Sequence, residues 1–158
     1  MKKLSITSFL GAWSLERAIN DISVGGEGRL SGTVDIRREG EGWAYNEKGA
    51  LRYGDQPQLA ATRRYLWQSL PGQRPGIEVL FEDGRPFHII DLGQTMPHAE
   101  HVCAPDLYHV TYDFAQWPTW YSVWRVSGPR KNYRMLSRYR PQGATGLAPP
   151  SPLGQIGE

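Results

Sequence analysis

The feature that most constrains the fold of this chain is a series of short segments in which apolar and polar residues alternate. A period of two places successive side chains on opposite faces, as in a β-strand with one buried face. After residue 28 the apolar residues recur with the period of two that is typical of strands. The predicted strands cover residues 29–38, 42–48, 62–70, 77–82, 87–92, 99–104, 107–115, 120–127 and 133–139.

Turn-forming residues separate nearly all of these segments. Asp83-Gly84, between two apolar runs, is the strongest hairpin signal, because glycine accepts the positive φ that tight turns require. About nine strands with short connections predict an antiparallel sandwich or barrel and not βαβ units. Further turns are predicted at Arg38-Glu39-Gly40, Pro71-Gly72, Trp117-Pro118 and Gly128-Pro129.

The segment 15–22 is the one predicted helix, and it precedes the strands. Leu15, Ala18, Ile19 and Ile22 have helical spacing on one face, and Ser14 is available as the N-cap. Three glycines at positions 25, 26 and 28 end the pattern. We therefore expect a mainly β fold with one short N-terminal helix.

Length and composition restrict the classes of protein that need to be considered. A chain of 158 residues fits one domain, here 1–140, followed by a tail at 141–158 that contains four Pro and four Gly. A net charge of +2 gives no reason to expect a nucleic-acid or membrane partner, and no segment is long and apolar enough to span a membrane.

The compartment is predicted from the cysteine content and the first residues. Cys103 is the single cysteine, so an internal disulfide framework is excluded and a reducing compartment is expected. The apolar stretch after Met1 is short and is interrupted by Ser5, Thr7 and Ser8, unlike a secretory signal. A cytoplasmic location follows as the expectation.

The sequence Gly11-Ala12-Trp13 predicts how one end of the barrel is closed. A tryptophan at the start of the first strand can plug that end, and glycine permits a sharp bend beside it. Arg138 or Arg140, late in the last strand, is expected to stack over the indole. This arrangement resembles that of the calycin, or lipocalin-like, up-and-down barrels, in which these residues are structural.

A more specific resemblance covers residues 9–140. The chain resembles a family of small bacterial and fungal proteins known only as a domain of unknown function. That resemblance implies a barrel but no activity, and Asn132 departs from the aspartate expected after the lysine. The motifs that carry it are Phe9-x-Gly11-x-Trp13-x-x-x-Arg17, Tyr45-x-Glu47-x-Gly49, Arg64-Tyr65-x-Trp67, Phe81-x-Asp83-Gly84-Arg85-x-Phe87-His88, His101-x-Cys103-x-x-Asp106-x-Tyr108 and Trp124-x-Val126-x-Gly128-Pro129-x-Lys131.

Two histidine-containing segments are candidates for chemistry. Alternation places His88 with Ile90 on the inward face and Phe87 on the other. Such a histidine is usually a hydrogen-bonded core residue, and a ligand contact is the alternative. His101 and Cys103 share a face, but one cysteine and loosely spaced histidines do not predict a metal site, and a buried structural cysteine is favoured over a nucleophile.

Basic residues late in the chain have two interpretations. Arg130, Arg134, Arg138 and Arg140 alternate with inward residues, which is typical of a solvated outer face. The rigid turn before Lys131 instead offers a rim clamp for a carboxylate or phosphate.

The leading hypothesis is a protein that holds an aromatic or acyl ligand with a polar or anionic end. The alternatives are an isomerase or hydrolase with His88 or His101 as base, and a protein-interaction barrel. No cofactor is expected; haem bound by either histidine is a variant of the first hypothesis. The expected partner is a small hydrophobic or amphipathic molecule, and a homodimer is left open. The predicted ligand-binding residues are Arg63, Tyr65, His88, His101, Tyr108, Tyr112, Trp124 and Lys131.

Overall fold

A computed structural model describes residues 3–23 and 25–142 of the chain. In this part of the chain the backbone forms one antiparallel sheet of ten strands in the order β6-β5-β4-β3-β2-β1-β10-β9-β8-β7. The strands are β1 (Gly11–Asp21), β2 (Gly26–Glu39), β3 (Gly42–Tyr53), β4 (Leu59–Ser69), β5 (Gly76–Phe81), β6 (Pro86–Asp91), β7 (His98–Cys103), β8 (Asp106–Asp113), β9 (Trp120–Ser127) and β10 (Asn132–Pro141).

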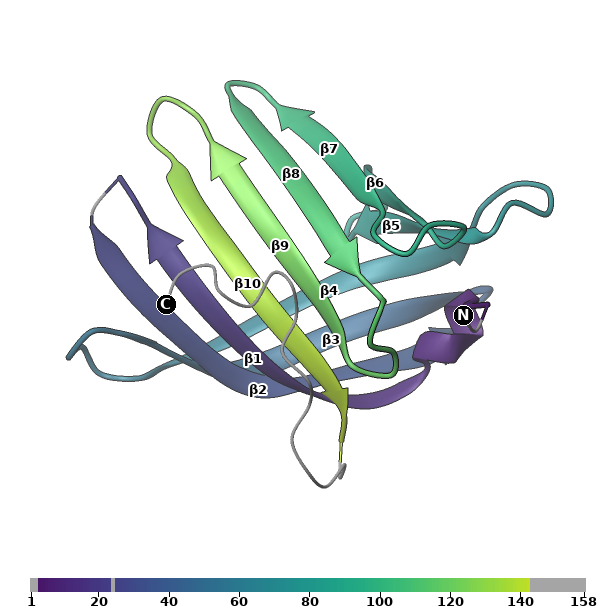
Figure 1. The fold of residues 1–158 in the computed structure, drawn as a ribbon, viewed down its shortest axis with the longest axis horizontal. Helices are drawn as coiled ribbons and strands as arrows, with labels where there is room; N and C mark the ends of the chain where they lie inside the picture. Colours follow the sequence, from purple (N-terminus) through teal and green to yellow (C-terminus); the bar gives the residue numbers. More distant parts are fainter. Residues whose placement is uncertain (1–2, 24, 143–158) are drawn as a thin grey trace.

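The sheet wraps into a nearly closed up-and-down barrel. Strands that follow one another in sequence are neighbours, except for β6 and β7 at the two edges of the sheet, and pairing of β1 with β10 joins the two halves. Figure 1 shows β8, β9, β10 and β1 crossing in front of β3 and β4, so that an interior lies between them. The end strands β6 and β7 contact each other, and their connection is tied to β8 by the bond from Tyr112 N to Pro97 O, 2.9 Å. The predicted mainly β barrel is therefore confirmed.

The predicted helix at 15–22 is wrong, because this segment belongs to β1. Its backbone pairs on both sides, with β2 and with β10, which satisfies its donors and acceptors in the sheet. Trp13, Leu15, Arg17 and Ile19 are buried in strict alternation, whereas Ile22 is 51% exposed. Leu15 and Ile19 are four residues apart, a spacing that fits a helix and a strand equally. Within the described residues the single helix is a 3-10 turn, η1 (Ile6–Phe9).

The nine predicted strands are all present, some with longer bounds. The turn at Asp83-Gly84 is confirmed: Gly84 has φ of 91°, and its N–H donates to the Phe81 carbonyl at 2.8 Å. The predicted tail begins inside β10, which ends at Pro141. Residues 143–158 lie outside the described residues. In the described part of the chain, no helix is long and apolar enough to cross a membrane.

Two glycines let strands β2 and β3 approach closely. Gly32 lies opposite Gly49 in the β2–β3 ladder. A Cβ at Gly32 would lie 2.1 Å from the Lys48 carbonyl oxygen and 2.6 Å from the Gly49 Cα. Because backbone atoms cannot move aside as a flexible side chain can, this approach requires glycine.

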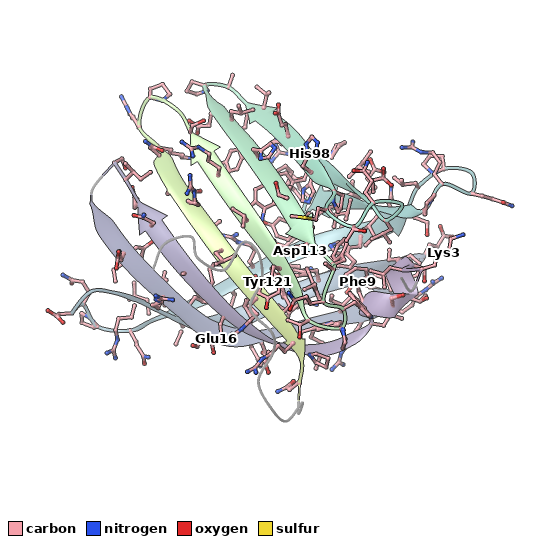
Figure 2. The ribbon with its side chains drawn as sticks, in the orientation of Figure 1. Lys3, Phe9, Glu16, His98, Asp113 and Tyr121 are labelled. Atoms are coloured by element: carbon pink, nitrogen blue, oxygen red, sulfur yellow. The ribbon has the colours of Figure 1, made fainter. Side chains whose placement is uncertain are left out.

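Aromatic side chains fill one end of the barrel. Phe9 is fully buried, and its ring packs edge-on against Trp67, Trp117 and Trp120 at centroid distances of 5.7, 4.8 and 5.3 Å. The Trp13 indole N–H donates to the Phe9 carbonyl at 2.8 Å. Figure 2 shows Phe9 at the end of the barrel where the N-terminal turn lies. The prediction that Trp13 helps to plug one end is confirmed.

The predicted arginine over Trp13 is not supported. Arg138 and Arg140 lie opposite Glu16 and Ser14 in the β1–β10 ladder, on the outer face. Trp13 points inward, where its ring contacts are with Trp117 and Trp120 at 5.6 and 5.7 Å. Because side chains alternate along a strand, Arg138 and Arg140 lie on the opposite face from the Trp13 indole. The Trp117 and Trp120 rings pack against the indole where an arginine was predicted.

Candidate functional site

The end of the barrel opposite Phe9 contains a cavity of about 620 Å³, named the large cavity to distinguish it from two smaller spaces inside the barrel. It reaches the surface, since the exposed residues Val102 and Cys103 contribute to its rim. The predicted burial of Cys103 is therefore wrong. This size is typical of pockets for small organic ligands. Six of its lining residues are aromatic: Tyr65, Phe81, Phe87, Tyr108, Trp124 and Tyr133.

Stacked rings form one wall of this cavity. Phe87 stacks on Phe81 at a centroid distance of 4.3 Å and on Trp124 at 5.2 Å. His101 stands edge-on to Phe81 at 5.5 Å and to Phe87 at 5.2 Å. A flat, polarisable wall of this kind favours a planar or extended apolar ligand.

A break in the pairing of β5 with β6 brings Phe87 to this wall. Val79 pairs with His88, whereas the next residue, Leu80, pairs with Pro86, so Phe87 is the extra residue on β6. A bulge of this kind lets two successive side chains point to the same face. His88 is buried as predicted, but Phe87 is also buried (7% exposed), contrary to the simple alternation.

A charged and hydroxyl-bearing cluster lies in the middle of the barrel. Arg17 donates to both carboxylate oxygens of Glu47, at 2.7 and 2.9 Å, and to the Ser137 hydroxyl at 2.7 Å. The Tyr45 hydroxyl donates to Glu47 Oε1 at 2.7 Å and lies 3.2 Å from the Tyr139 hydroxyl. Each of these side chains is buried.

These contacts fix the charges of the cluster. Burial raises the pKa of the Glu47 carboxyl, but the hydrogen bonds and charge of Arg17 outweigh it, and the pKa is lowered overall. Burial opposes ionisation of Arg17, yet the hydrogen bond to Glu47 raises its pKa above the ordinary value. The pair therefore stays ionised with no net charge.

Arg63 differs from Arg17 in having no such partner. It lies opposite Glu47 in the β3–β4 ladder and projects into the barrel, where it lines the large cavity. Arg63 is exposed to solvent. Among the described residues, none forms a hydrogen bond or ion pair with its guanidinium. Arg85, the other arginine at this cavity, is paired with Asp83 at 2.7 Å.

His88 and Tyr112 form a hydrogen-bonded pair below the cavity. Their Nε2 and hydroxyl oxygen are 2.8 Å apart, and within the described structure His88 Nδ1 is buried without a partner. Burial, followed by the nearby His101, lowers the pKa of His88 to about 3, so its imidazole is neutral. Both residues line a space of about 30 Å³, separated from the large cavity by Arg63, Tyr65 and Trp124.

Lys131 lies at the rim and outside the lining of the large cavity. Its ammonium pairs with Asp106 at 3.1 Å and donates to the Tyr108 hydroxyl at 3.2 Å. These two hydrogen bonds raise the pKa of Lys131. Lys131, predicted to clamp a ligand anion at the rim, is therefore paired with a carboxylate of the protein itself.

The structure brings most of the predicted binding residues together. Arg63, Tyr65, His101, Tyr108 and Trp124 surround the large cavity, and His88 and Tyr112 lie directly beneath it. Sequence reasoning missed the Arg17–Glu47 pair and the aromatic residues Phe81, Phe87 and Tyr133. Glu47, two residues from inward Tyr45 in an alternating segment, was a detectable signal of an interior charge.

Comparison with known proteins gives the family. A model described as a family of unknown function (DUF6314) matches residues 9–141. The chain belongs to this family. No curated protein matches the chain.

A solved structure with a similar fold is the S-type phycobiliprotein lyase CPES from Guillardia theta. The TM-score is 0.58 with 8% sequence identity, over 90% of this chain and 96% of the lyase chain. At that identity the similarity establishes the shared fold only.

Proposed function

We propose that this protein binds a small amphipathic molecule with an aromatic or acyl body and an anionic end. The observation that carries the proposal is Arg63, an arginine without an ion-pair or hydrogen-bond partner among the described residues, inside an aromatic cavity of about 620 Å³. Guanidinium groups bind carboxylates and phosphates through two parallel hydrogen bonds. The apolar body lies along Phe81, Phe87 and Trp124.

The electrostatics of the interior favour an anion over a cation. Arg17 and Glu47 neutralise each other, and Arg85 is paired with Asp83. Arg63 then contributes a positive charge that a bound carboxylate can neutralise. A charge-assisted hydrogen bond is worth roughly 1.5–3 kcal/mol, or about ten- to a hundredfold in affinity.

The test is calorimetric titration with naphthalene-2-carboxylate, a flat aromatic acid. We expect one site per chain, and a roughly ten- to hundredfold weaker affinity in Arg63→Gln. Arg125→Gln is the matched control, because Arg125 is exposed on the outer face of β9. Naphthalene-2-carboxamide, which has no charge, should bind wild type and Arg63→Gln equally.

Two results would contradict the proposal. One is equal affinity of Arg63→Gln and wild type for the acid. The other is failure of the acid to bind the wild-type protein at one site. Near-ultraviolet circular dichroism of each variant establishes that its aromatic packing is retained.

A catalytic role on such a molecule is the alternative, since a protein of the same fold is a lyase. His88 is too weak a base for this role at neutral pH, with a pKa of about 3. His101 lines the cavity and is the remaining candidate for a base or for a haem ligand. Titration with haem tests the second role, and absence of a Soret band would exclude it.

Two broader assignments accompany the proposal. We assign the barrel to the calycin type, on its up-and-down strand order and the plug formed by Trp13. We place the protein in the cytoplasm, because its single cysteine suits a reducing compartment.

A further inference from the structure

A second chamber lies beside the large cavity. It has a volume of about 210 Å³ and shares Arg63, Tyr133 and Met135 with the large cavity. The two spaces therefore lie on either side of a partition formed by one side chain from β4 and two from β10.

The chambers differ in the shapes that they fit. The large one has a wall of stacked aromatic rings. The small one is lined by Tyr53 and Tyr133 and by an aliphatic patch with side chains from four strands: Ile19, Leu30, Leu51 and Ala61. An aliphatic patch suits a flexible alkyl group, which gains affinity from buried area alone.

The charges also differ between the two sides of Arg63. Asp21 lines the small chamber, and its carboxylate accepts hydrogen bonds from the Ser23 hydroxyl at 2.6 Å and N–H at 3.1 Å. The Glu47 carboxylate at this chamber is neutralised by Arg17. A ligand anion is repelled by Asp21 and so binds Arg63 from the large cavity.

We propose that the ligand is forked and occupies both chambers, with its anionic group at Arg63 between them. An aromatic arm fills the large cavity, and a short alkyl arm from the carbon next to the carboxylate fills the small one. This inference rests on the proposed function and specifies the class of ligand: a branched aryl carboxylate and not a linear one.

The test is a series of 2-(2-naphthyl)alkanoates in which the second arm is hydrogen, ethyl or butyl. Each methylene buried in the small chamber is expected to tighten binding about fourfold in calorimetric titration. Ala61→Leu fills this chamber from β4, so the gain with arm length should disappear while the compound without an arm keeps its affinity. Ala60→Leu, exposed on the outer face of the same strand, is the matched control and should keep the gain.

The outcomes separate this inference from the proposed function. If no member of the series binds, the proposed function fails. If 2-naphthylacetate binds through Arg63 and the longer arms add nothing in the wild-type protein, the inference alone is overturned. Retention of the arm-length gain in Ala61→Leu would also overturn it. The wild-type series decides the question even if Ala61→Leu does not fold.

Discussion

Arg17 and Glu47 occupy positions on β1 and β3 where a barrel normally has apolar side chains. Removing two charges from water costs several kcal/mol per ion, and the cost is recovered only when the geometry is good and the remaining donors are satisfied. Here the contact is bidentate, and Ser137 and Tyr45 complete the hydrogen bonding. The cost of removing Arg17 and Glu47 from water is therefore offset as long as both partners are present.

Removal of one partner should therefore be far more costly than removal of both. Glu47→Leu is expected to lower the free energy of unfolding by about 3–5 kcal/mol in urea denaturation, because Arg17 is left buried and unpaired. Arg17→Met combined with Glu47→Leu should recover much of this loss. The exposed pair of Arg37 with Asp35 is the control, and Arg37→Gln should change stability little. A double variant no more stable than Glu47→Leu would refute this account.

His88 should make the protein sensitive to acid. Its pKa falls from the ordinary value of 6.5 to about 3 in the folded chain, so the unfolded chain binds more protons between these values. Stability is then complete above about pH 6.5 and decreases as the pH falls toward 3, by up to about 1.4 kcal/mol per pH unit. The lowered pKa of Glu47 adds a loss in the same direction at the acidic end.

The variant His88→Phe should remove most of the slope of unfolding free energy against pH between 6.5 and 4, although it lowers stability by leaving Tyr112 without its partner. His98→Gln, which removes an exposed imidazole on β7, should keep the wild-type slope. Urea denaturation at several pH values measures both. A wild-type slope in His88→Phe would show that another group is responsible.

At the scale of elements, the sequence predicted where strands occur better than it predicted which side chains of a strand point into the barrel. Nine of the ten strands follow from alternation and turn residues, because both signals are local. β1 was mistaken for a helix because Leu15 and Ile19 fit both periods. Its pairing with β2, the next strand, and with β10, far away in sequence, decides between them.

The site was predictable to the extent that its residues alternate regularly. His88 and Tyr112 were placed inside correctly, whereas the bulge at Phe87 depends on how β6 pairs with β5 and has no clear local signal. Arg17 was missed as an interior charge because its segment was assigned to the wrong element. Which inward residues line a cavity and which fill the core depends on the packing of the whole barrel.

On the scale of the whole molecule, the two ends of the barrel have different roles. Aromatic residues fill the end around Phe9 and Trp13, and the buried Arg17–Glu47 pair lies between that end and the large cavity. The aromatic plug and the hydrogen-bonded Arg17–Glu47 pair leave the other end hollow, and Arg63 is held there on a strand and not on a loop. In this arrangement a ligand that binds only the folded chain should also stabilise it.

A crystal structure with naphthalene-2-carboxylate would show whether this cavity holds an anionic aromatic molecule through Arg63. We expect the naphthalene ring against Phe87 and Trp124 and the carboxylate within hydrogen-bonding distance of the Arg63 guanidinium. A ligand bound on the outer surface, or one in the cavity with its carboxylate directed away from Arg63, would contradict this expectation.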